Sequence, residues 1–71
     1  MMFNHSKLLG RIKEVGITQE ELAHRIGIKP NTLSFKLNNG SKFKTDEILL
    51  LCEVLQINTQ YIPLYFFTLK V

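Results

Sequence analysis

The chain has 71 residues, which excludes more than one domain and leaves a hydrophobic core barely large enough for a stable fold. Its composition, 45% hydrophobic and 21% charged, excludes a disordered chain, and it contains neither a run of about 18 apolar residues nor a secretory leader. The single cysteine, Cys52, excludes an internal disulfide and suits a reducing compartment. We therefore expect one cytoplasmic domain without a membrane partner, at a size where dimerisation commonly adds stability.

A first helix is predicted from Asn4 or Ser6, which are both good N-caps, to Val15. Leu8, Ile12 and Val15 recur at the spacing of a helix. The glycine that follows would end this helix, because glycine adopts the left-handed conformation without steric cost.

Two helices joined by a tight turn are predicted over residues 18–38. Thr18 and Glu21 form a capping box that starts the first of them. Gly27 ends it, and Pro30 suits the first turn of the next helix, where its missing N–H would have no intrahelical partner. This pattern is typical of a helix-turn-helix.

The spacing of Ala23, Gly27 and Leu33 resembles the helix-turn-helix of the phage Cro and repressor family, in which the second helix enters the major groove of DNA. The resemblance covers about residues 6–57. The tail, residues 62–71, is similar to the ending of small Cro-like regulators from phages of Gram-positive bacteria. The resemblance implies an all-α, five-helix, lambda-repressor-like DNA-binding domain with a possible short C-terminal strand.

One position departs from the family pattern. Lys36 stands where the family usually has an apolar residue, so Leu37 would have to pack inward in its place. The capping and glycine signals alone would also fit an αα-hairpin with no role at DNA.

The charges are unevenly distributed along the chain. All six acidic residues lie outside residues 22–45, whereas that span contains five basic ones. The basic residues of the span are Arg25, Lys29, Lys36, Lys42 and Lys44. A surface of one sign favours a phosphate backbone, because each neutralised phosphate releases counterions. A solvated face with chance clustering is the alternative.

These observations nominate DNA contacts on and around the second helix of the pair. The candidate base contacts are Asn31, Ser34, Phe35 and Asn38. Asn can pair with adenine in bidentate fashion, whereas Phe35 could contact only a thymine methyl group or could instead belong to the core. The candidate phosphate contacts are Gln19, Lys29, Thr32, Lys36, Asn39, Ser41, Lys42 and Lys44.

Two further helices are predicted after this pair. Thr45 would cap the fourth, whose inward face has apolar residues at helical spacing. These residues are Ile48, Leu51, Cys52 and Leu55. Asn58 would cap a short fifth helix over 59–65, and Phe43 would anchor the preceding loop in the core.

The tail after this helix is too apolar for a solvated end. Apolar and polar residues alternate from Phe67, which predicts a half-buried strand. Since no other segment reads as a strand, the expected partner is the same segment of a second subunit, paired antiparallel about a two-fold axis. The predicted dimer interface consists of Phe66, Phe67, Leu69 and Val71. Folding of the tail onto its own domain is the alternative.

Signals for catalysis are missing from the sequence. His5 and His24 are isolated, no metal-ligand spacing occurs, and no serine is arranged with a histidine and an acid in a recognised pattern. We therefore expect no enzyme activity, metal or cofactor. The predicted function is that of a homodimeric transcription regulator that binds an operator in double-stranded DNA, in the nucleoid of a bacterial host. The alternatives are a protein-interaction module that captures a partner repressor, and an antitoxin.

Overall fold

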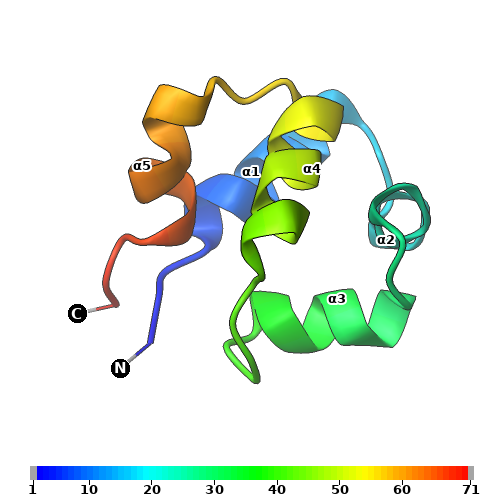
Figure 1. Ribbon diagram of the computed structural model, residues 1–71, viewed down its shortest axis with the longest axis horizontal. Helices are drawn as coiled ribbons and strands as arrows, with labels where there is room; N and C mark the ends of the chain where they lie inside the picture. The colour runs from blue at the N-terminus through cyan, green and yellow to red at the C-terminus, as the bar shows by residue number, and fades with distance from the viewer. Residues whose placement is uncertain (1, 71) are drawn as a thin grey trace.

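The computed structural model describes residues 2–70, which contain five α-helices and one 3-10 turn (Figure 1). The elements are α1 (Ser6–Val15), α2 (Gln19–Ile26), α3 (Pro30–Leu37), α4 (Thr45–Leu55), the 3-10 turn η1 (Thr59–Tyr61) and α5 (Ile62–Phe66). The predicted all-α, five-helix fold is confirmed. No helix among these residues has the length and apolar composition needed to cross a bilayer.

Local capping signals set most helix boundaries. The Thr18 hydroxyl accepts a hydrogen bond of 3.1 Å from the Glu21 N–H, and α2 ends at Gly27 with φ +79°. α1 likewise ends at Gly16 with φ +81°. Two predicted caps were wrong: the N-cap of α1 is His5 and not Asn4 or Ser6, and the N-cap of α4 is Lys44, with Thr45 as the first helical residue.

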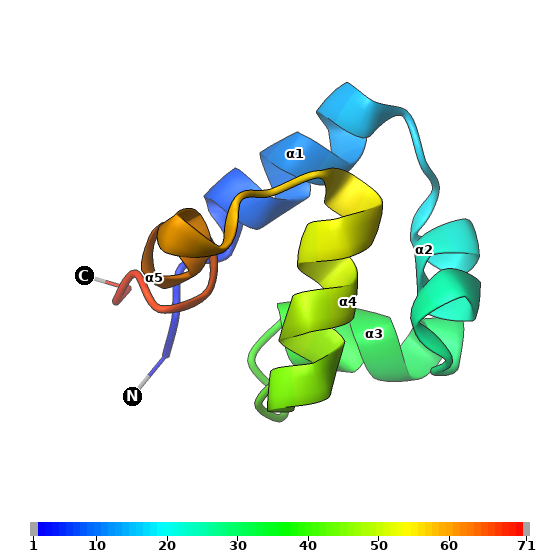
Figure 2. The same ribbon diagram turned by 45° about the horizontal axis from the view of Figure 1, so that its top comes forward.

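The core lies where α4 meets the other helices. Figures 1 and 2 both show α4 in the centre, with α2 on one side and α5 on the other. α2 packs against α3 and α4, while α1 packs against α4 and α5. Ala23 is fully buried, as expected for a small residue where α2 and α3 approach each other. The other buried apolar residues are Leu8, Ile12, Leu22, Ile26, Leu33, Leu37, Ile48, Leu51, Cys52, Leu55, Ile57 and Phe66.

The tail pairs with the N-terminal segment, residues 2–4, of its own chain. Phe3 and Leu69 form an isolated antiparallel bridge. The Asn4 N–H donates to the Thr68 carbonyl at 2.7 Å, and the Lys70 N–H donates to the Met2 carbonyl at 3.0 Å. The tail therefore pairs within its own chain, as in the alternative, and not with the same segment of a second subunit, because residues 2–4 were not recognised as a strand.

This pairing changes the predicted dimer interface. Phe66 is 2% exposed and belongs to the core of its own chain, so it is unavailable to a second subunit. Phe67 and Leu69 are about half exposed. Val71 lies outside the described residues. Dimerisation stays a prediction, without the unpaired strand that motivated it.

Candidate functional site

The outer face of α3 carries the residues expected to contact bases. Asn31, Phe35 and Asn38 are exposed, and Ser34 is half-buried. Phe35 is 58% exposed, so the alternative that it belongs to the core was wrong. The Asn38 amide donates to the Ser34 carbonyl at 2.8 Å, which engages that side chain at the end of α3.

The Phe35 ring lies over Gly40, in the loop that follows α3. A Cβ atom on Gly40 would stand 2.3 Å from the ring, and the Gly40 N–H donates to the Phe35 carbonyl at 2.8 Å. The missing side chain of Gly40 therefore allows an aromatic ring to lie flat at the end of the helix.

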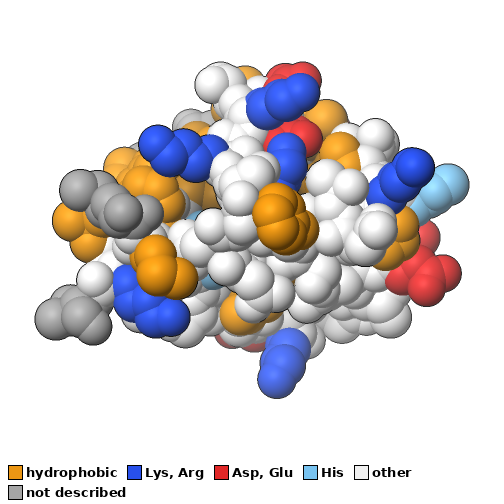
Figure 3. Space-filling view, turned by 90° about the horizontal axis from the view of Figure 1, so that it is seen from below, with side chains coloured by type: hydrophobic (Ala, Val, Ile, Leu, Met, Phe, Trp, Pro, Cys, Tyr) orange, Lys and Arg blue, Asp and Glu red, His pale blue; other side chains and the backbone are white. Residues whose placement is uncertain are grey.

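The expected phosphate contacts divide into two groups. Those that are accessible around α3 are Gln19, Lys29, Thr32, Ser41, Lys42 and Lys44, of which Thr32 is half-buried. Figure 3, which views the side on which α3 lies in Figure 1, shows a mainly uncharged face with basic groups, and some acidic ones, around its edge. Two expected contacts, Lys36 and Asn39, are engaged inside the molecule instead.

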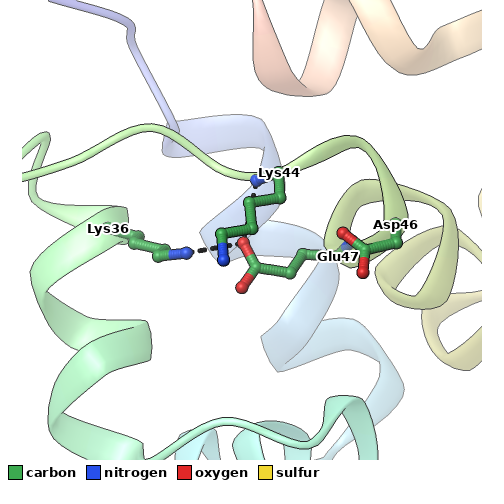
Figure 4. A network of polar contacts seen from close by, with 4 residues as sticks. All are labelled: Lys36, Lys44, Asp46 and Glu47. Atoms are coloured by element: carbon green, nitrogen blue, oxygen red, sulfur yellow. Dashed lines mark hydrogen bonds and ion pairs between the residues drawn. The ribbon is translucent and has the colours of Figure 1, made fainter.

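Lys36 is buried against α4, so its assignment as a phosphate contact was wrong. Its Nζ lies 2.6 Å from Oε1 of Glu47, and Glu47 also accepts a hydrogen bond of 2.8 Å from the Lys44 N–H (Figure 4). Burial alone would raise the pKa of Glu47, but the hydrogen bonds from Lys36 and Lys44, with the charges of both lysines, outweigh it and lower the pKa. The family's apolar position is thus occupied by one half of a buried ion pair, while Leu37 packs inward as predicted.

Asn39 holds the N-terminal segment rather than a phosphate. Its Oδ1 accepts from the Phe3 N–H at 2.9 Å, and its Nδ2 donates to the Phe3 carbonyl at 2.8 Å. Both polar atoms of the carboxamide are therefore occupied within the chain, which corrects the expected role of this residue.

Aromatic side chains from distant parts of the chain meet beside this contact. The Phe3 ring packs edge-on against Phe67 at 5.5 Å between centroids, and Phe43 packs between His5 at 5.7 Å and Phe66 at 5.8 Å. Phe43 thus anchors its loop inward as predicted. Together they surround a cavity of about 310 Å³, which we call the aromatic cavity.

The wall of the aromatic cavity has polar and apolar parts. Its lining comprises Phe3, His5, Asn39, Gly40, Ser41, Lys42, Phe43, Ile48, Phe66 and Phe67. His5 is 7% exposed and donates from Nδ1 to the Leu37 carbonyl at 2.9 Å. Sequence reasoning missed Phe3 and His5 as site residues. The available signal was that both an aromatic residue and a histidine precede the first helix.

Apolar side chains continue from the cavity onto the surface. Leu64 and Phe67, three residues apart at the end of the chain, are both exposed, as are Met2 and Leu69 on the paired segments. Figure 3 shows hydrophobic groups gathered on the side where the chain ends lie in Figure 1. Elsewhere in residues 2–70, no group of three His, Cys, Asp or Glu side chains could hold a metal ion.

Comparison with known proteins shows a family to which the chain is matched and a solved structure that it resembles. The chain is similar to the modulator of repression (MOR) of the temperate bacteriophage TP901-1 from Lactococcus lactis, whose solution structure is known. The two share 45% sequence identity over 100% of this chain and 96% of that chain, with a TM-score of 0.79. A search of curated proteins finds no match.

The expected resemblance to small phage regulators is therefore supported, whereas membership of the Cro and repressor family itself stays a prediction. The model of one family, described as "Protein of unknown function (DUF739)", matches residues 1–69. That match spans almost the whole chain, and the chain therefore belongs to the DUF739 family.

Proposed function

We propose that this chain modulates repression in a temperate phage by binding a repressor protein, without catalysing a reaction. The observation that carries this proposal is the 45% identity, over the full length of the chain, to a modulator of phage repression. Repression is exerted by a repressor at its operator, so a modulator must change either the free repressor or the occupancy of the operator. A chain that binds the repressor would change the amount of free repressor and, as a result, the occupancy of the operator.

The aromatic cavity and its apolar surroundings suit a protein partner. Aromatic side chains at a pocket commonly supply most of the binding free energy of a protein interface. Phe67 combines a ring in the wall of the cavity with 47% exposure, so one side chain of a partner could contact it and enter the cavity. Lys42, also in the lining, would favour a partner with an acidic group beside that side chain.

Direct binding of operator DNA through α3 is the second candidate. It is favoured by the exposed Asn31 on α3 and by the lack of acidic residues in the span 22–45. The first candidate is preferred because two of the expected phosphate contacts, Lys36 and Asn39, are engaged within the chain. Loss of the Lys36 contact removes counterion release, and loss of the Asn39 contact removes a hydrogen bond to the backbone, so both lower the affinity for DNA.

Two measurements separate the candidates. The chain is mixed with the repressor encoded in the same genome, and complex formation is followed by light scattering and calorimetry. In parallel, the chain alone is titrated onto operator DNA at about 50 and about 200 mM salt. If the chain acts by binding the repressor, we expect a stable complex with the repressor and only weak, strongly salt-dependent binding to DNA. Tight binding of operator DNA by the chain alone, with no repressor complex, would overturn it.

A further inference from the structure

The N-terminal segment, residues 2–4, is held along both of its edges. On one edge, Asn4 and Met2 exchange hydrogen bonds with the tail on either side of the Phe3–Leu69 bridge. In an antiparallel pair bonded in this way, the two bridged residues point their own N–H and C=O groups away from each other. The backbone of Phe3 therefore faces the opposite edge, and there it meets the side chain of Asn39.

The Asn39 carboxamide provides both groups that this second edge requires. It offers one acceptor and one donor, spaced as in a peptide group, and pairs with the Phe3 N–H and C=O at 2.9 and 2.8 Å. Asn39 also has a φ of +67°, a left-handed conformation that Asn tolerates better than most residues. Its backbone forms the turn that follows α3. Its side chain pairs with the Phe3 backbone as a neighbouring strand would.

The position of the N-terminal segment determines the shape of the aromatic cavity. Phe3 forms part of the wall and packs against Phe67, while His5 packs against Phe43 on the other side. A shift of the Phe3 backbone would therefore move the ring that borders Phe67.

We infer that Asn39 is a positioning residue for partner binding, because it fixes the N-terminal segment as one wall of the aromatic cavity. The inference rests on the proposed function for the identity of the partner, a repressor protein. The loop after α3 thus helps to set the shape of the surface that residues 2–4 and the tail form together.

If Asn39 only stabilised the left-handed turn, Asn39→Gly would leave the N-terminal segment in place. If its side chain positions that segment, the same variant should release it. Asn39→Gly satisfies the backbone conformation better than Asn but removes both hydrogen bonds to Phe3. Asn39→Asp keeps the acceptor for the Phe3 N–H but places a carboxylate oxygen opposite the Phe3 carbonyl, so it also loses the donated bond and provides a second variant should the glycine variant unfold. Asn38→Ala is the matched control, since its amide bonds only to α3.

The free chain decides the first step. We expect Asn39→Gly to accelerate solvent exchange of the Asn4 and Lys70 amides about tenfold, and to shift the ring resonances of Phe67, as measured by NMR. The amides of Leu22 and Leu51 in the core report whether the fold is intact. Unchanged exchange at Asn4 and Lys70, with unchanged Phe67 ring signals, would overturn the inference.

Binding to the repressor decides the second step. We expect Asn39→Gly to weaken the complex about tenfold relative to Asn38→Ala, and Asn39→Asp to weaken it as well. If the native chain binds the repressor and Asn39→Gly binds it equally well, the inference is wrong while the proposed function stands. If the native chain binds no repressor, the proposed function and the positioning role in partner binding both fail, and the free-chain measurement shows separately whether Asn39 holds the wall of the cavity.

Discussion

The Nζ of Lys36 and the Oε1 of Glu47 lie 2.6 Å apart, with each side chain less than one tenth exposed. This contact joins α3 to the first turn of α4 and allows a lysine to occupy an inward position of α3. Since buried charges are stable only when paired, each residue depends on the other for its place in the core.

Removal of the lysine alone should therefore be strongly destabilising. We expect Lys36→Met to lower the free energy of unfolding by about 3 kcal/mol, because it leaves the Glu47 carboxylate buried without its cation. Urea denaturation followed by circular dichroism measures the change. Lys29→Met, at an exposed lysine just before the same helix, is the control and should change stability by less than about 0.5 kcal/mol. Equal losses in the two variants would contradict the importance of the pair.

The lowered pKa of Glu47 predicts a dependence of stability on pH. Its folded pKa lies below the ordinary value of 4.5, so the unfolded chain takes up this proton first as the pH falls. The stabilisation is fully present above about pH 5 and is lost as the pH falls through the folded pKa. Melting temperatures between about pH 6 and about pH 3 should fall more steeply for the native chain than for Glu47→Gln. Parallel curves would show that Glu47 makes no such contribution.

Two half-exposed phenylalanines distinguish the candidate surfaces. Phe67 borders the aromatic cavity, and Phe35 lies on the outer face of α3. We expect Phe67→Ala to weaken the repressor complex at least tenfold, or about 1.4 kcal/mol, and Phe35→Ala to leave it nearly unchanged. Calorimetry on both variants gives the comparison, and the reverse order would place the partner on α3.

A side chain at position 40 should displace the Phe35 ring and leave the rest of the fold unchanged. The atoms that a Cβ on Gly40 would meet belong to the outer part of an exposed ring, which can rotate away. We expect Gly40→Ala to cost less than about 1 kcal/mol and to change the ring environment of Phe35 in NMR spectra. A loss of about 2 kcal/mol or more, at the level of a core defect, would mean that the ring is fixed in place.

If the chain binds operator DNA directly, the second candidate, then variants at base contacts and at phosphate contacts should behave differently. Asn31→Ala should relax preference at one base position at a cost of about 1–3 kcal/mol. Lys29→Ala should weaken all sequences alike and reduce the salt slope by about one unit. Titrations on operator and unrelated DNA test this, and identical effects of the two variants would rule out direct readout by Asn31.

Signals contained within one turn of chain were sufficient to predict the helices. Thr18, Gly27 and Pro30 act on neighbouring backbone groups, so their consequences do not depend on distant residues. The five-helix fold and the inward position of Leu37 followed from such local patterns.

The corrections concern residues whose partners are distant in the sequence. Lys36 and Asn39 are residue types that commonly contact phosphates. Only the fold brings the Glu47 carboxylate to Lys36 and the Phe3 backbone to Asn39. The strand character of residues 2–4 has no periodic signal of its own, since a segment this short gains its conformation from the groups that pair with it. For the same reason, the aromatic cavity could not be predicted, because its rings come from both ends of the chain and from the loop after α3.

The bridge between Phe3 and Leu69 also sets the order in which the molecule can be completed. Contacts between residues so far apart require closure of nearly the entire chain, whereas each helix and the α2–α3 turn need only neighbouring residues. During synthesis, residues 2–4 leave the ribosome before the helices do, but they can pair with the tail only after the helices have been made. A nascent chain can therefore form α1 to α4 before its aromatic cavity exists, and it can bind a partner through that cavity only after residues 66–69 have been synthesised.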